Sequence, residues 1–215
     1  MKRFICLFLS AVLLMFLCVN ALGEEIDRSV FEDCEDATFA YDEREGGYVL
    51  KTTHSAADSV ADWAGGLNLD MIMVEDVCVL RMTMLVMNIG GDLPGFSEAV
   101  FHTDGYTYKI PVKMANDVSH AEYAAQAMRI ALGETGVDLI EDILDSDEDV
   151  LVEYNGTQKN VHFVLSDSQR EILEVMFALY AESGAIDQDV KVLNALYPII
   201  KIERMQQDDE EQDTE

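Results

Sequence analysis

Positive charge is scarce in this sequence. Its 215 residues include 14 lysines and arginines against 42 aspartates and glutamates, which gives a formal net charge of −28 at pH 7. Nucleic-acid binding needs a basic surface, and anionic membranes repel an acidic one, so the composition argues against both as partners. A strongly acidic surface attracts basic proteins and divalent cations. The expected partner is therefore a protein or a small cation, and the alternative is that the negative charge serves solubility alone.

Motifs of catalysis and of cofactor binding are lacking as well. The sequence contains no phosphate-binding loop, no glycine-rich dinucleotide motif and no CxxC or SxxK pair, and its histidines lack the spacing of a metalloprotease. We expect an exported, acidic, non-enzymatic binding or interaction module that needs no cofactor. Two alternatives remain open: an exported hydrolase whose active-site residues are dispersed along the chain, and a surface protein that binds divalent cations with low affinity.

Long apolar runs are missing except at the N-terminus. There, two basic residues precede an uncharged apolar run from Ile5 to Val19, which ends in small residues followed by acidic ones. This pattern is typical of a secretory signal peptide, and the run is too short for a convincing membrane span. It predicts a signal peptide over residues 1–23, cleaved after Gly23 or after Ala21, and a secreted or extracytoplasmic protein. The alternative is an uncleaved N-terminal anchor.

Cysteine is also scarce, and only Cys34 and Cys78 lie beyond the predicted signal peptide. An even pair in an exported protein is a candidate disulfide. The sequence leaves a second interpretation open, because Cys78 lies in an apolar run and is equally suited to be a small buried hydrophobic residue.

Acidic residues are abundant, and one group of them has the spacing of a cation site. Asp145, Asp147 and Asp149 alternate in the run DSDED, and carboxylates at alternate positions can converge on a hard cation such as calcium. The pattern departs from an EF-hand loop, because Val150 stands where that loop needs glycine and Gly156 where it needs glutamate. The three aspartates are therefore a candidate for a weak cation site. The alternative is a solvated connection between a helix and a strand.

One segment has the clear pattern of a core strand. From Val77 to Asn88, five successive even-numbered positions are apolar, whereas the odd-numbered positions mix apolar residues with Arg81 and Thr83. A period of two with one wholly apolar face predicts a strand that buries that face. The methionines of this face are therefore interpreted as core residues rather than as ligands of copper. We expect a charge at Met84 or Leu80 to unfold the protein, and changes at Arg81 or Thr83 to be mild.

Turn and capping signals divide the rest of the chain into short elements. Strands are predicted over residues 38–41, 48–53, 77–88, 98–103, 106–110, 149–154 and 161–165, and helices over 55–64, 119–132, 137–144, 168–183 and 189–197. This order predicts an α+β fold, an antiparallel sheet built from hairpins with a C-terminal group of helices packed on it. Residues 24–35 are expected to be an acidic N-terminal arm, 36–202 a single α+β domain and 203–215 a disordered acidic tail. A split near 115–119 into two domains is the alternative.

Overall fold

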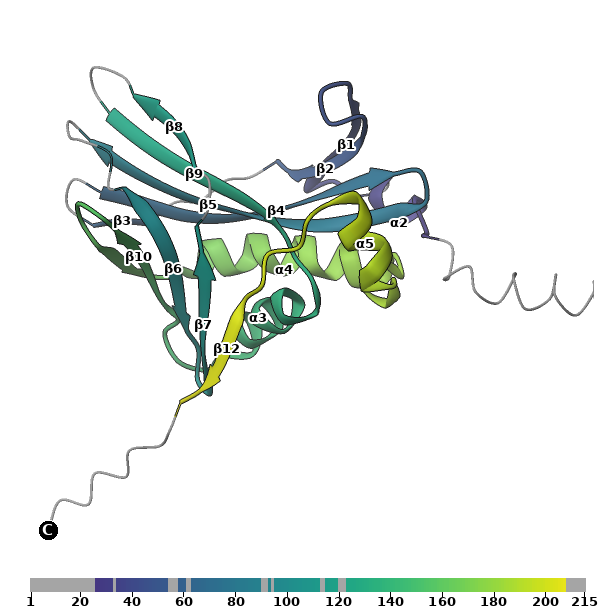
Figure 1. Ribbon diagram of the computed structural model, residues 1–215. Coiled ribbons are helices and arrows are strands. Elements are labelled where there is room, and N and C mark those ends of the chain that lie inside the picture. Colours follow the sequence, from purple (N-terminus) through teal and green to yellow (C-terminus); the bar gives the residue numbers. More distant parts are fainter. Residues whose placement is uncertain are drawn as a thin grey trace, which may run out of the picture.

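The computed structural model describes residues 26–32, 34–53, 58–60, 63–89, 93, 95–112, 115–119 and 123–207. The predicted signal peptide and the end of the predicted acidic tail lie outside the described residues. The described part is an α+β structure made mostly of strands, which form two antiparallel sheets (Figure 1). The predicted fold class is confirmed at this level, with two sheets in place of one. In this part of the chain, no helix is both long and apolar enough to cross a membrane.

The two sheets differ in size, and we call the larger one sheet A. Its strands are β1 (Ala37–Asp42), β2 (Gly47–Thr52), β3 (Asp58–Val60), β4 (Trp63–Val74), β5 (Val77–Ile89), β8 (Asn116–Ser119) and β9 (Tyr123–Ala131). They pair in the order β1-β2-β4-β5-β9-β8, and β3 pairs with β4. Sheet B contains β6 (Phe96–His102), β7 (Tyr106–Pro111), β10 (Leu151–Gly156), β11 (Val161–Val164) and β12 (Glu203–Gln206), in the order β11-β10-β6-β7-β12.

The helices lie between and around these sheets. They are α2 (Ser29–Glu32), α3 (Glu134–Asp145), α4 (Asp167–Glu182) and α5 (Val190–Leu196), with a 3-10 turn over Ala185–Asp187. Figure 1 shows α3 and α4 in the angle between the two sheets, with α4 running along the underside of sheet A. The cap of α4 is Ser166, whose hydroxyl accepts a hydrogen bond from the N–H of Gln169 (3.4 Å). The helix therefore begins one residue earlier than the predicted range of 168–183.

The inner face of sheet A, which packs on α4, is apolar. In β4 and β5 its side chains are almost completely buried: Leu67, Leu69, Met71, Met73, Cys78, Leu80, Met82, Met84 and Val86. Met71 lies opposite Leu80 in the antiparallel register, and opposite residues share a face, so both strands contribute to one layer. The period-two pattern of β5 is confirmed, and the methionines of its inner face, Met82 and Met84, belong to the core. A polar side chain of α4 also packs in this layer: fully buried Gln169 accepts a hydrogen bond from the N–H of Leu67 (2.7 Å).

The opposite, outer face of sheet A is covered differently. At one end, Leu193 of α5 packs on Val49, Ile72, Val79 and Ala131, which come from β2, β4, β5 and β9. The helices α4 and α5 thus cover opposite faces of the sheet, and α3 precedes β10 and β11 in the chain. The expectation of one C-terminal group of helices on the sheet is therefore met only in part.

The helix predicted over residues 119–132 is wrong. This segment contributes to β8 and β9, and β9 pairs with β5 along its whole length, from Arg81↔Ala131 to Ile89↔Tyr123. Burial alternates along β9, with Met128 and Ile130 on the buried side. An alanine-rich sequence favours a helix locally, but pairing with a long buried strand outweighs that weak preference.

The helix predicted over residues 55–64 also fails where the structure describes it. Residues 58–60 are β3, and β4 begins at Trp63. The strand β4 pairs with β5 from Trp63↔Asn88 to Val74↔Val77, so its extended conformation is fixed by a neighbouring strand. The sequence of β4 contains no turn or capping signal that predicts this pairing.

Two short elements occur where the sequence predicts no regular structure. The helix α2 buries Phe31, and β12 pairs with β7 at the edge of sheet B. Arg204 anchors β12: its guanidinium lies 3.8 Å from the centre of the Tyr106 ring and forms ion pairs with Asp138 (3.1 Å) and Asp142 (3.0 Å) of α3. This side chain thereby adds to the backbone pairing with β7 in holding the exposed strand β12 against sheet B and α3.

Candidate functional site

The three aspartates proposed as a cation site lie at the end of α3 and in the connection to β10. Backbone groups of that connection already have partners within the protein. The Asp104 carboxylate accepts hydrogen bonds from the N–H of Asp147 (2.8 Å) and of the next residue (3.3 Å), and Arg170 donates to two carbonyl oxygens of the same loop. Among the described residues, no three acidic, histidine or cysteine side chains are placed to hold a metal ion together. Cation binding by Asp145, Asp147 and Asp149 stays a prediction.

The two cysteines of the proposed disulfide differ in their environment. Both are free thiols in the structure, Cys34 half-buried and Cys78 fully buried on the inner face of sheet A. Burial raises the pKa of the Cys78 thiol to about 12, because the apolar layer does not solvate a thiolate. The pairing of Cys34 with Cys78 stays a prediction for chemical analysis.

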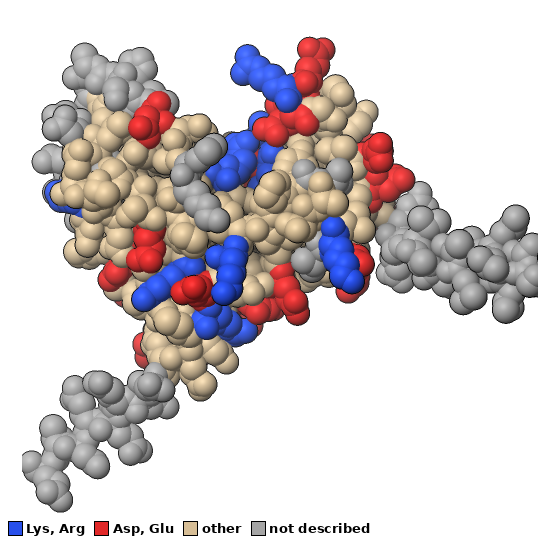
Figure 2. All heavy atoms as spheres, in the orientation of Figure 1, with Lys and Arg blue, Asp and Glu red and all other residues tan. Residues whose placement is uncertain are grey.

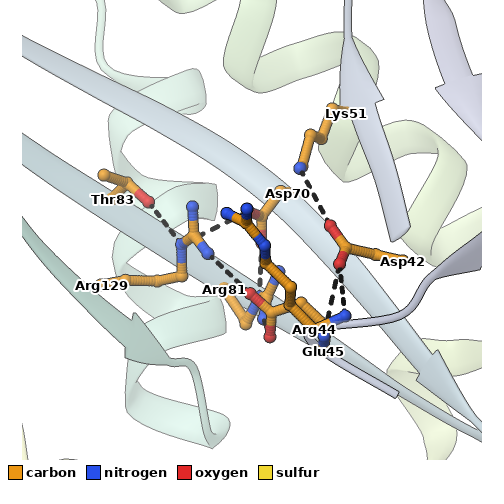
Figure 3. A network of polar contacts seen from close by, with 8 residues as sticks. All are labelled: Asp42, Arg44, Glu45, Lys51, Asp70, Arg81, Thr83 and Arg129. Atoms are coloured by element: carbon orange, nitrogen blue, oxygen red, sulfur yellow. Dashed lines mark hydrogen bonds and ion pairs between the residues drawn. The ribbon is translucent and has the colours of Figure 1, made fainter. Parts of the chain in front are cut away.

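A network of charged side chains occupies the outer face of sheet A, beside the part that α5 covers (Figure 3). Asp70 on β4 lies directly opposite Arg81 on β5. In the next row along the same face, Thr83 on β5 lies opposite Arg129 on β9. Glu45, in the turn between β1 and β2, contacts both arginines. Three neighbouring strands and one hairpin turn therefore build the network.

Asp70, Arg81, Glu45 and Arg129 form a closed ring in which the signs of charge alternate, and we call it the charged ring. Arg81 Nε donates to Asp70 Oδ1 (2.6 Å), and Arg81 Nη1 donates to Glu45 Oε2 (2.8 Å). Arg129 Nη1 donates to Glu45 Oε1 (3.2 Å), and Arg129 Nε lies 3.5 Å from Asp70 Oδ2 and donates to Thr83 Oγ1 (3.1 Å). Each carboxylate thus binds both arginines, one through each oxygen.

Arg81 is the buried cation of the ring and Arg129 the accessible one. The side chains of Arg81 and Asp70 are 4% and 6% exposed, whereas those of Arg129 and Glu45 are 41% and 30% exposed. Burial alone would lower the pKa of Arg81, but the hydrogen bonds and charges of Asp70 and Glu45 outweigh it, and the pKa is raised above its ordinary value. Arg81 is therefore a fixed charge, while Arg129 can be reached from solvent.

Among the residues that the structure describes, two buried polar atoms on this face have no hydrogen-bond partner. They are Nη2 of Arg81, which is a donor, and Oδ1 of Asn68, which is an acceptor. Asn68 lies opposite Thr83, so it is diagonal to Arg81 on the same face of the sheet. A buried polar group without a partner costs roughly 1–3 kcal/mol. A bound molecule that supplies an acceptor to one and a donor to the other would remove that cost.

The β1–β2 hairpin places Glu45 over the sheet. Asp42 Oδ1 accepts hydrogen bonds from the N–H groups of Arg44 (2.9 Å) and Glu45 (3.3 Å), which tightens the turn. Gly47 then lies so close to β4 that a Cβ atom there would be 2.5 Å from the carbonyl oxygen of Met73. The absence of a side chain at this position lets the hairpin approach β4 and brings the turn above the arginines.

The network concentrates positive charge in a chain that has little of it. The ion pairs in Figure 3 join three basic and three acidic side chains: Lys51, Arg81 and Arg129 with Asp42, Glu45 and Asp70. The whole sequence, by contrast, has 14 basic and 42 acidic residues. Figure 2 shows basic side chains in the hollow at the upper edge of the molecule, between β8–β9 and the β1–β2 hairpin. The outer face of sheet A is therefore a place where an acidic molecule can accept an anion.

The sequence alone does not reveal this site, and the expectation that Arg81 lies on a tolerant face is wrong. Arg81 is as buried as its apolar neighbours, and its charge is compensated by Asp70 and Glu45. The available signal is that Arg81 is the single charged residue of this mostly apolar strand. Its partner could not be named, because Asp70 lies on β4, for which no strand was predicted.

The chemistry of the charged ring is suited to binding rather than to proton transfer. Guanidinium groups stay protonated at physiological pH, so neither arginine can act as a general base. Both carboxylates are held in ion pairs with these arginines. No protein-family model, curated protein or solved structure matches the chain. The geometry of the ring is therefore the basis on which a function can be proposed.

Proposed function

We propose that this protein is an exported, non-enzymatic binding module that holds an anionic group on the outer face of sheet A. The observation that carries the proposal is Arg81, a buried and ion-paired arginine with one donor left unused, next to the solvent-accessible Arg129. The planar fork of arginine binds carboxylate-like and phosphate-like groups through several hydrogen bonds at once.

The surroundings of the ring support a role in binding over a role in stability alone. A buried ion pair is weak evidence for stability, because apolar residues of similar volume are often as good or better in its place. The neighbouring row of the same face, with Val49, Ile72 and Val79, is packed in that apolar way under α5. Apolar side chains could therefore have continued this layer at the position that the charged ring occupies.

The strands beneath the ring favour preorganised binding. Asp70 on β4 and Arg81 on β5 are paired with a neighbouring strand on both sides, and Arg129 on β9 is paired with Thr83 of β5, so all three residues are attached to a rigid platform. Charged groups held in advance lose little freedom when a ligand arrives, which improves affinity.

The charge of the whole chain limits the size of the anion. A net charge of −28 repels extended polyanions such as nucleic acid at long range. A small organic anion, or one anionic group on another protein, feels this field much less. The predicted signal peptide places the encounter outside the cytoplasm, where we propose that the module acts.

The test is a titration of the purified protein with acetate, N-acetyl-L-leucine and inorganic phosphate, followed by backbone amide chemical shifts. We expect at least one anion to shift the amides of Asp70, Arg81 and Arg129. Arg129→Gln should weaken this binding at least about tenfold, since a charge-assisted pair is worth about 1.5–3 kcal/mol. The matched control is Arg28→Gln, because Arg28 is similarly exposed (44%) and pairs with Asp76 outside the ring. Binding that Arg28→Gln weakens as much as Arg129→Gln would refute the proposal, as would the absence of any shift at the ring.

A further inference from the structure

Glu45 shows which kind of group the two arginines accept. Its carboxylate bridges them, with Oε2 2.8 Å from Arg81 Nη1 and Oε1 3.2 Å from Arg129 Nη1. Unlike the other members of the ring, Glu45 comes from a turn, between the edge strand β1 and its neighbour β2. Edge hairpins open at a lower free-energy cost than the interior of a sheet. The Glu45 carboxylate is therefore the member of the ring that a ligand can replace.

The charge that remains after Glu45 leaves matches a single negative charge. Arg81 and Arg129 contribute +2 and Asp70 contributes −1, which gives 2 − 1 = +1. Asp70 cannot leave, because it is 6% exposed and belongs to β4. A phosphate monoester carries about −1.5 to −2 at neutral pH, and its excess charge would lie beside the buried Asp70 carboxylate, which repels it. A carboxylate fits this balance better than a phosphate.

The two unpartnered atoms indicate what lies next to the ligand's carboxylate. Nη2 of Arg81 is buried and donates no hydrogen bond to Glu45, so a carboxylate that replaces Glu45 has this donor available to it. Oδ1 of Asn68 needs a donor, and an N–H group adjacent to the carboxylate would supply it. The next row of the outer face contains Leu85 opposite Ala127, both apolar and half-buried, so an apolar side chain has a surface to lie on.

We infer that the charged ring binds the C-terminal end of a peptide: its carboxylate takes the place of Glu45, its last N–H donates to Asn68, and an apolar last side chain lies on Leu85 and Ala127. This inference rests on the proposed function, because it names the ligand of the same two arginines. Capture of a terminal carboxylate is a recognised mode of peptide binding. Glu45 is then the internal competitor that keeps the arginines paired while the site is empty.

The decisive experiment compares Glu45→Gln with Glu43→Gln. Both substitutions remove one negative charge from the same turn, but only Glu45 contacts the arginines. The probe is N-acetyl-L-leucine, which carries a carboxylate, an adjacent N–H and an apolar side chain. If Glu45 occupies the arginines in about nine of ten molecules, Glu45→Gln raises the apparent affinity about tenfold. Glu43→Gln should leave the affinity close to that of the unchanged protein.

Three further probes test the chemical assignment in Glu45→Gln. N-acetyl-L-leucinamide, which lacks the carboxylate, should not bind. Acetate, which lacks the N–H and the side chain, should bind more weakly than N-acetyl-L-leucine, and so should inorganic phosphate. If acetate binds as tightly, the ligand is a simple organic acid, and if phosphate or the amide binds as tightly, it is not a carboxylate; each result overturns the inference.

Failure of the inference and failure of the proposed function give different results. If N-acetyl-L-leucine binds Glu45→Gln no more tightly than the unchanged protein, Glu45 does not compete with it, and the inference is overturned while anion binding stands. If no anion binds either protein, both proposals are overturned. The amide spectrum recorded in each titration also shows whether the variant is folded, so a loss of structure cannot be mistaken for a loss of binding.

Discussion

The two faces of sheet A bury their residues by different means. β4 and β5 contribute alternate residues to both faces, so neighbours such as Arg81 and Met82 share nearly the same burial, 3% and 0% exposed. Burial of Met82 is favourable by itself, because apolar surface leaves water. Burial of Arg81 is tolerable only because Asp70 and Glu45 compensate its charge. The inner face thus depends on composition and packing, whereas the charged ring on the outer face depends on particular pairs.

The largest effect is expected from a charge on the inner face. Met84→Asp places a carboxylate in a layer where the side chain is 0% exposed and no basic residue is opposite, since its partners are Leu67 and Met128. The cost of burying an unpaired charge is comparable to a whole domain's stability of about 5–15 kcal/mol, so the protein should unfold. Circular dichroism and urea denaturation measure this. Met84→Leu should cost less than about 1.5 kcal/mol, and a cooperative transition for Met84→Asp near that of Met84→Leu would contradict the assignment of the face.

The second-largest effect is expected on the outer face. Two variants separate the contribution of the Arg81–Asp70 ion pair from the contribution of burying these side chains. Arg81→Ala leaves the Asp70 carboxylate buried without its main partner, and we expect a loss of about 3–5 kcal/mol in the free energy of unfolding. The double substitution Arg81→Met with Asp70→Leu removes both charges and should recover most of that loss. Denaturant titrations of both variants decide the point. If Arg81→Ala is as stable as the unchanged protein, the ring contributes nothing to folding.

A smaller effect is expected at Gln169, a polar side chain of α4 that packs on the inner face of sheet A. Gln169→Leu removes the acceptor of the Leu67 N–H, which then lies buried without a partner at an expected cost of about 1–3 kcal/mol. Thermal or urea denaturation measures the change. The control is Glu171→Gln, at an exposed position of the same helix, which should stay within about 0.5 kcal/mol. Equal effects of the two substitutions would show that α4 is not held to β4 by this hydrogen bond.

The fourth prediction concerns chemical reactivity instead of stability. It compares the thiol of Cys78, buried on the inner face of sheet A, with the half-buried thiol of Cys34. The pKa of Cys78, raised to about 12 by burial, leaves almost no thiolate at pH 8, whereas Cys34 is half-buried. Without denaturant or reductant, iodoacetamide should modify Cys34 faster than Cys78, and urea should remove the difference. Mass spectrometry of the peptides measures both rates. If neither thiol reacts even in urea, and a linked peptide is recovered, the two cysteines form the predicted disulfide.

The smallest effect is expected from the acidic residues that lie on neither face. A dispersed negative charge predicts that calcium and magnesium raise the melting temperature equally at matched ionic strength, through screening alone. A calcium site with a dissociation constant of about 1 mM would add roughly 1 kcal/mol at about 5 mM calcium, or about 2–4 °C for a domain of this size. We expect no such excess. A calcium-specific shift that Asp147→Asn abolishes would instead establish the cation site at Asp145, Asp147 and Asp149.

Much of the local structure could be predicted from the sequence. The alternation in β5, the Asp104-Gly105 turn between β6 and β7, and the stripe of apolar residues in α4 each reflect forces that act over a few neighbouring residues. The acidic composition and the apolar N-terminal run are equally local properties, which is why they gave definite expectations about partners and export.

Only the tertiary structure decided which distant segments of the chain are in contact. β9 is a strand because β5 offers it a complete set of backbone partners, although its alanine-rich sequence favours a helix. The charged ring joins residues 45, 70, 81 and 129, from a turn and three strands, and no spacing in the sequence links them. The physical reason is that a buried charge is compensated through space: which carboxylate faces Arg81 depends on the register of β4 and the bend of a hairpin, and only folding sets both.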